Sequence, residues 1–395
     1  MSHNWKHPRT ITGGTAEGGR YFPRKSIEEA IWREIDKGNH IRFNAPRRLG
    51  KTSVMKAIAR HPQKGYRCIY QNISSDDKAQ EFYGRLLHLL LKELSGMQAF
   101  KAKFTNWITE HGISEVGTTG LKISQKDGDN KQRFLALLPE LKESEVKIVL
   151  LLDEFPDVIH GITQREGSEV ARDVLQTLRS LTHNDDFKGH FTLVLAGSIG
   201  LDHIVKKVDR TVVINVYRKI DVTPLEGEEP NEFISFLLKG ATLQMNQNTR
   251  DYLIKKLNRP LPYFIQLIIE QCNDMLHKEG RLNLEPSDID KAWDYLLTQH
   301  EHFDDWDYRL RVFFDEDYSF YVEILSKCAH NGSLSIQEAY DIGLKHRKEI
   351  SYKAKIDDVL INDGYLLQEG NSLKFISPLL QDWWKNRHPL INPKS

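Results

Sequence analysis

The stretch A-P-R-R-L-G-K-T, residues Ala45–Thr52, follows directly on the apolar segment His40–Asn44. It fits the phosphate-loop pattern, in which a small residue, here Ala45, is followed after four positions by Gly-Lys-Thr. Such a loop turns backbone N–H groups around a β-phosphate, and the next helix adds the positive end of its dipole. A strand before the loop and a helix from Lys51 to about Arg60 are the expected context. An ordinary strand-to-helix turn is the alternative.

Each residue type in this loop has a chemical reason to be there. Gly50 allows the backbone to approach the phosphates, Lys51 reaches the β- and γ-phosphates, and the Thr52 hydroxyl can ligate Mg²⁺. Arg47 and Arg48 leave three alternatives open: contact with phosphates, contact with a neighbouring subunit, or exposure to solvent.

A second segment, Lys147–Glu154, is an apolar run that ends in two carboxylates. Such a run suits a strand buried on both faces of a parallel sheet, and the carboxyl end of such a strand is where open α/β sheets bind ligands. Asp153 is expected to hold Mg²⁺ through its water shell, and Glu154 to polarise the water that attacks the γ-phosphate. The two segments together predict a nucleoside triphosphatase that uses Mg²⁺.

Composition narrows the class of protein. The 395 residues carry 55 Lys and Arg against 55 Asp and Glu, so the overall charge favours neither nucleic acid nor an acidic partner. No apolar run approaches the roughly 20 residues that span a bilayer, and the first residues lack an apolar secretion signal. Three widely spaced cysteines favour a reducing cytoplasm over a disulfide framework or a metal site. We therefore expect a cytoplasmic protein without membrane segments.

Strands alternate with helices through the first half of the chain, which predicts a mostly parallel, three-layer α/β sheet. The expected strands are 40–44, 67–73, 147–154, 191–196 and 212–217. The expected helices are 26–38 (capped by Ser26), 51–60, 79–94, 134–141 and 168–182, with a small hairpin near 121–124. We assign this core to residues 1–225.

From Pro230 on, the alternation of strands and helices ends. Consecutive helices are expected at 231–238, 248–257, 263–277 and 286–300. We assign residues 226–305 to a helical lid and interpret 302–307 as a linker. Residues 306–395 read as three helices followed by two short strands around Gly370-Asn371, which is the order of a winged helix.

This order of motifs resembles the prokaryotic signal-transduction ATPases related to AAA+ proteins (STAND), often described as archaeal-type ATPases. The resemblance rests on Pro46-Arg47-Arg48 before Leu49–Ser53 and on the Leu-Asp-Glu-Phe-Pro segment Leu152–Pro156. It covers nearly the whole chain and implies a P-loop ATPase core, a lid and a C-terminal winged helix.

The resemblance also implies roles for four residues outside the two motifs. Ser198 matches a polar sensor of the γ-phosphate, with ordinary turn chemistry as the alternative. Arg218, ahead of a Pro-Leu pair, matches a finger that acts in its own site or in a neighbour's, with a surface ion pair as the rival. Pro262 matches a lid proline that packs on adenine. Arg24 is the last residue of the segment Tyr21–Arg24, which is similar to a sequence motif that lies near the nucleotide base in the family.

The winged helix leaves nucleic acid open as a partner. Residues 345–355 carry five cations, but residues 306–395 hold twelve Lys and Arg against thirteen Asp and Glu. A DNA-binding module usually has a clearer basic excess. In the family such modules also dock on the ATPase core.

The sequence therefore predicts an ATP-hydrolysing switch that acts through its lid and winged helix on a partner protein, for which an effector encoded nearby is the expected candidate. A homo-oligomer is compatible with this prediction. The alternative is a DNA-associated motor or loader that binds nucleic acid through the winged helix. Nucleotide binding without hydrolysis is disfavoured, because Glu154 is present.

Overall fold

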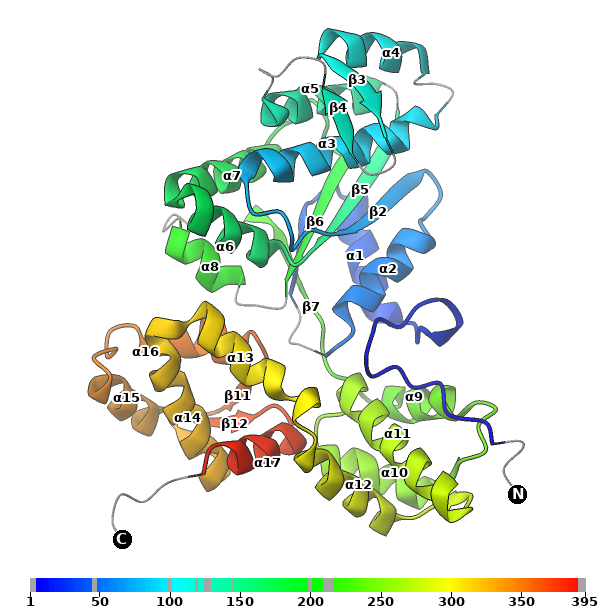
Figure 1. The fold of residues 1–395 in the computed structure, drawn as a ribbon, viewed down its shortest axis with the longest axis vertical. Coiled ribbons are helices and arrows are strands. Elements are labelled where there is room, and N and C mark those ends of the chain that lie inside the picture. The colour runs from blue at the N-terminus through cyan, green and yellow to red at the C-terminus, as the bar shows by residue number, and fades with distance from the viewer. Residues whose placement is uncertain are drawn as a thin grey trace. The chain divides into compact units, whose positions relative to one another are not determined.

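The computed structural model describes residues 5–44, 48–97, 101–117, 120–123, 129–143, 145–197, 201–208 and 216–389. The chain forms two compact units (Figure 1). The sheet unit consists of Pro23–Asn44 and Val54–Asp221, and the lid unit consists of Met1–Phe22, Ala45–Ser53 and Val222–Ser395. The phosphate-loop segment thus groups with the C-terminal half of the chain. The three domain ranges assigned from the sequence stay predictions.

The sheet unit is built on five parallel strands in the order β2-β5-β6-β1-β7. Their bounds are β1 Ile41–Asn44, β2 Tyr66–Asn72, β5 Lys147–Asp153, β6 Phe191–Gly197 and β7 Arg218–Asp221. Asn72 pairs with Asp153, and Asn44 pairs with Gly197. The carboxyl ends of four strands therefore meet at one edge of the sheet.

Helices flank this sheet on both faces, α1 and α2 on one side and α3, α6 and α7 on the other (Figure 1). The helix bounds are α1 Lys25–Asp36, α2 Lys51–Arg60, α3 Ala79–Ser95, α5 Asn130–Glu143, α6 Phe155–Glu166, α7 Ser168–Leu181 and α8 Leu201–Val208. Both faces are covered, so β5 and β6 are buried almost throughout and consist mainly of apolar residues. The predicted three-layer parallel α/β core is confirmed.

Local differences from the sequence predictions have identifiable causes. Helix α1 begins after Arg24, so Ser26 lies inside the helix and the predicted Ser26 cap is wrong. The expected hairpin is present as β3 Ile113–Val116 and β4 Leu121–Ile123, and α4 Lys101–Glu110 precedes it. Most of the expected strand 212–217 falls outside the described residues, and the strand observed there, β7, begins only at Arg218.

The lid unit contains four consecutive helices at the positions where helices were predicted between residues 231 and 300. They are α9 Glu229–Leu238, α10 Gln247–Leu257, α11 Pro262–Glu279 and α12 Pro286–Thr298, with a two-residue parallel pair, β8 Gln244–Met245 and β9 Asn283–Leu284. None of the described helices is long and apolar enough to span a membrane.

The segment Trp5–Phe22 contacts these helices through hydrogen bonds and aromatic packing. The backbone N–H of Ile11 donates to Gln266 Oε1 at 2.8 Å, and the Trp5 indole donates to Asn273 at 2.9 Å. Phe22 packs against Phe233, with ring centres 5.2 Å apart. This strap is thus part of the lid unit.

The C-terminal module begins with a helix at the position where a linker was expected. The 3₁₀ turn η4 His300–His302 leads to α13 Asp304–Phe313, and both Phe303 and Trp306 are fully buried. The linker interpretation was wrong, because these aromatic side chains belong to the core.

The rest of this module has the predicted order of three helices and a β-hairpin. It contains α14 Tyr318–Asn331, β10 Leu334–Ser335, α15 Ile336–Lys345, α16 Tyr352–Lys355, a π-helical turn Ile356–Ile361, β11 Leu366–Glu369, β12 Ser372–Phe375 and α17 Pro378–Arg387. The three strands form an antiparallel sheet in the order β10-β12-β11.

Candidate nucleotide-binding site

Asp153 ends β5 at the carboxyl edge of the sheet and is 1% exposed. Its carboxylate accepts hydrogen bonds from the Tyr70 hydroxyl at 3.2 Å and from the backbone N–H of Glu154 at 3.1 Å. A buried carboxylate needs such partners, because burial without them is costly. The carboxylate oxygens of Asp153 are therefore held in position at the edge where open α/β sheets bind ligands.

Glu154 occupies the left-handed region of backbone space, with φ 61° and ψ 38°. Residues other than glycine adopt this conformation at a cost, and such residues concentrate at functional sites. The left-handed turn ends β5 and lets α6 begin at the next residue, Phe155.

The end of β6 is packed tightly against the start of α6. A Cβ atom on Gly197 would lie 2.3 Å from two ring carbons of Pro156, so only glycine fits at this position. Ser198, the predicted γ-phosphate sensor, lies outside the described residues.

Tyr70 was missed in the sequence. Burial, with further contributions from Asp153 and Glu154, raises the pKa of its phenol, so the hydroxyl stays protonated and donates to Asp153. The Lys56 ammonium lies 5.2 Å from the centre of the Tyr70 ring. The available signal was the position of Tyr70 near the carboxyl end of β2, beside the strand that carries Asp153.

The described part of the phosphate loop has the backbone that its sequence requires. Gly50 has φ 89°, a conformation that side chains rarely adopt. Lys51 is buried and opens α2, and Leu49 is buried beside it. The Ser53 hydroxyl accepts a hydrogen bond from the Ala16 N–H at 3.1 Å, so the strap contacts the loop. Ala45, Pro46 and Arg47 lie outside the described residues.

Arg48 contacts the first turn of lid helix α11. Its guanidinium carbon lies 4.3 Å from the centre of the Tyr263 ring, a cation–π distance, and its own φ is 66°. Pro262, the predicted adenine contact, is the first residue of α11, a position that proline favours. The lid unit therefore brings together Arg48 and the Pro262-Tyr263 turn, which were selected from separate motifs.

Tyr263 and its neighbour Phe264 also contact residues at the start of the C-terminal module. The Tyr263 hydroxyl lies 3.4 Å from His302 Nδ1. Burial lowers the pKa of His302; the Arg48 charge lowers it further, and Glu301 and Glu270 oppose this. Phe264 stacks on Phe303 at 6.1 Å.

Two residues suggested by the resemblance lie elsewhere in the sheet unit. Arg24 is buried at the start of α1, and its backbone N–H donates to Glu28 at 3.0 Å. Arg218 pairs in register with Ile41, whereas Asn44 pairs with Asp221. Arg218 is thus at the amino end of β7, opposite the edge that carries Asp153, and it forms an ion pair with Glu34 at 3.9 Å.

The basic stretch of the C-terminal module is largely paired with acids. Lys348 and Lys355 both bind Asp317. Burial raises the pKa of Asp317, but these two lysines outweigh it, and the pKa falls below its usual range. Further pairs join Lys345 and His346 to Glu323, and Lys353 to Asp357.

The oxygen donors predicted for the metal fit Mg²⁺ by type. The Thr52 hydroxyl and the Asp153 carboxylate are hard ligands of the kind that Mg²⁺ uses together with substrate phosphates. Within the described part of the chain, no group of three or more His, Cys, Asp or Glu could hold a metal by itself.

Comparison with known proteins agrees with this geometry. Residues 37–205 match the family described as AAA domain. Together with the five-stranded parallel sheet, this match defines an AAA+-like P-loop ATPase fold. No curated protein matches the chain.

Among the solved structures that resemble nearly the whole chain are two with a TM-score above 0.5. The Walker-type ATPase PABY2304 of Pyrococcus abyssi has a TM-score of 0.59 at 15% identity, over 94% of this chain and 98% of its own. The ORC2 protein of Aeropyrum pernix, solved as ADPNP-ADP complexes, has a TM-score of 0.51 at 12% identity, over 96% and 95%. At these identities the similarity establishes the fold.

Proposed function

We propose that this protein is an ATP-hydrolysing signal-transduction switch of the STAND type, which acts on a partner protein through its lid and a C-terminal winged helix. The observation that carries the proposal is the contact of Arg48, in the phosphate loop, with Tyr263, in the lid. A residue of the loop that touches the lid directly can transmit the presence of a phosphate to it.

In this proposal the loop residues Ala45–Ser53 bind the phosphates of ATP, with Lys51 facing the β- and γ-phosphates. Thr52 and Asp153 would hold Mg²⁺, which would neutralise phosphate charge. Glu154 takes a proton from the attacking water. Tyr70 keeps the Asp153 carboxylate in place.

The other predicted contacts complete the site. Ser198 senses the γ-phosphate, and Arg24 and Pro262 contact the nucleotide. Arg218 acts in the site of a neighbouring copy, because its place at the amino end of β7 does not suit its own site. This role requires a homo-oligomer.

An aromatic path supports transmission beyond the lid. Phe264 follows Tyr263 in α11 and stacks on Phe303, and Phe303 stacks on Trp383 of α17 at 5.5 Å. The Trp293 indole of α12 also donates to Asp382 of α17 at 2.9 Å. Packed aromatic side chains of this kind couple the two regions, because close-packed interiors transmit small shifts.

The charge pairing of the C-terminal module supports a protein partner over nucleic acid. Protein–DNA affinity comes largely from cations that neutralise phosphates. Here four of the five cations of residues 345–355, all except Arg347, form ion pairs with Asp317, Glu323 or Asp357. Phosphate binding would have to break these pairs first.

The test combines hydrogen exchange with ATP hydrolysis. Saturating ATP and Mg²⁺ should change exchange in α11 and α17 of the wild type and leave the Lys51→Ala variant unchanged. Duplex DNA should leave the hydrolysis rate unchanged. Stimulation by DNA, with binding that weakens steeply with salt, would instead identify a DNA-associated motor or loader, and unchanged exchange with bound ATP would refute the switch.

A further inference from the structure

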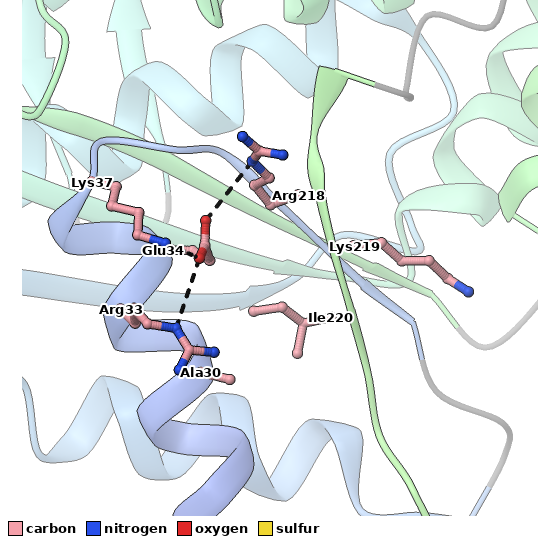
Figure 2. A pocket seen from close by; sticks show the side chains of 7 residues that line it. All are labelled: Ala30, Arg33, Glu34, Lys37, Arg218, Lys219 and Ile220. Atoms are coloured by element: carbon pink, nitrogen blue, oxygen red, sulfur yellow. Dashed lines mark hydrogen bonds and ion pairs between the residues drawn. The ribbon is translucent and has the colours of Figure 1, made fainter.

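A second concave site lies on the sheet unit, between α1 and the edge strand β7. It is a cavity of about 450 Å³ lined by Ala30, Arg33, Glu34, Lys37, Arg218, Lys219 and Ile220. Figure 2 shows Arg33 and Arg218 on either side of Glu34, with Lys37 on the same carboxylate and Lys219 pointing away. Three cations thus converge on one acid.

The Glu34 carboxylate attracts all three cations, but both guanidinium groups lie beyond hydrogen-bond distance from it. Glu34 accepts short hydrogen bonds from Lys37 at 2.7 Å and from Asn39 at 2.8 Å. The guanidinium groups are more distant: among the described residues, Arg33 and Arg218 each have Glu34 as their ion-pair partner, and both at 3.9 Å. Each guanidinium therefore keeps N–H donors available towards the cavity.

The Glu34 carboxylate is ionised at neutral pH. The hydrogen bond from Lys37 lowers its pKa, burial opposes this, and Asn39 and the Arg218 charge lower it further. One negative charge against three positive charges leaves a net excess of two in a small volume.

We propose that this cleft binds a compact anion that carries two or more phosphate groups. Guanidinium forks match phosphate oxygens in pairs, and charge-assisted hydrogen bonds of this kind are the stronger ones. A tripolyphosphate chain places several charges within a volume of this size.

A nucleic-acid strand fits the surroundings less well. Glu29 and Asp36 are exposed on the same helix, so no continuous basic stripe runs along α1. A strand that follows the helix would meet these acids, whereas a compact anion avoids them.

The probe for this site is sodium tripolyphosphate, titrated by calorimetry at low ionic strength into the Lys51→Ala protein, which disables the phosphate loop as a competing site. The additional substitution Arg33→Ala should weaken binding about tenfold, and Arg33→Lys, which keeps the charge and loses the fork, should lie in between. Lys219→Ala is the matched control, because its ammonium points away and pairs with Asp221 at 3.1 Å. It should change the affinity less than about twofold.

Three results would overturn the proposal. The first is no binding to the Lys51→Ala protein. The second is an equal loss in the Arg33 and Lys219 variants, which would indicate non-specific charge attraction. The third is binding of duplex DNA or of an acidic peptide that depends on Arg33, with no binding of tripolyphosphate. The outcome is independent of whether the phosphate loop binds ATP.

Discussion

The guanidinium carbon of Arg48 lies 4.3 Å from the centre of the Tyr263 ring, so a residue of the phosphate loop is in contact with the first turn of helix α11. A double-mutant cycle with Arg48→Ala and Tyr263→Leu measures this contact. We expect a coupling free energy of about 1 kcal/mol in chemical unfolding without nucleotide, because a partly buried cation–π pair is worth about that much.

His302 reports on the same contact. The Arg48 charge contributes to the lowered pKa of His302, so Arg48→Ala should raise that pKa towards its ordinary value, and Arg48→Lys should preserve it. The measurement is an NMR titration of the imidazole. A coupling energy of zero, together with an unshifted His302, would show that the loop and the lid turn are energetically independent.

Lys51→Ala should abolish high-affinity ATP binding. The substitution removes the charge that faces the β- and γ-phosphates in the proposed site, and hydrogen bonds to charged groups are the strong ones. Calorimetry of ATP binding is the measurement, and Lys64→Ala, on the exposed segment after α2, is the control. Unchanged affinity in a folded Lys51→Ala protein would contradict the phosphate-loop assignment.

Glu154→Gln should separate binding from hydrolysis. Glutamine keeps the size of the side chain but cannot accept the proton of the attacking water, so turnover should fall by about 10²-fold while ATP still binds. Steady-state phosphate release and calorimetry check the two effects. Glu169→Gln changes an exposed carboxylate at the start of α7 and should leave both unchanged. A wild-type rate in the Glu154 variant would show that another residue acts as the general base.

The sequence was sufficient for those parts of the fold that have strong local patterns. The runs that became β5 and β6 are mainly apolar, and that pattern is typical of a strand covered on both faces. Gly50 could be placed in the loop because its spacing to Lys51 and Thr52 is fixed by phosphate geometry.

Contacts between segments that are distant in the chain could not be predicted from local sequence patterns. The strap Trp5–Phe22 lacks periodicity, and its order comes from hydrogen bonds to α11, more than 250 residues away. The Arg48–Tyr263 contact likewise depends on tertiary packing. Arg218 was expected to follow a strand, but it begins β7, and a strand of four residues has too little pattern to fix its ends.

His40 should make stability depend on pH. Burial lowers its pKa to about 4, with opposition from a hydrogen bond to Leu181, and the neutral ring accepts a hydrogen bond from the Leu193 N–H at 2.9 Å. The folded state disfavours protonation, so this contribution is complete above pH 6.5 and is lost as pH falls towards 4. The difference amounts to about 3 kcal/mol at 1.36 kcal/mol per unit.

The matched variant is His40→Asn, whose amide oxygen can accept the same hydrogen bond without titrating. Urea unfolding between pH 7 and 4 should show a steeper loss of stability in the wild type than in the variant. Parallel pH profiles for the two proteins would mean that His40 is protonated as easily in the folded chain as in the unfolded one.

Arg218→Ala tests whether neighbouring copies complete one another's sites. Arg218 lies at the amino end of β7, opposite the edge that carries Asp153, so a catalytic role requires a second copy. If its guanidinium neutralises charge that develops on a neighbour's γ-phosphate, the substitution should lower turnover more than ATP affinity, because the contact strengthens in the transition state. Mixing Arg218→Ala with Lys51→Ala should then restore part of the activity, since some interfaces pair an intact loop with an intact arginine. Each variant mixed with inactive protein that carries both substitutions is the control and should show no recovery. A normal rate in Arg218→Ala alone would leave this residue with its ion pair to Glu34 and with the anion cleft.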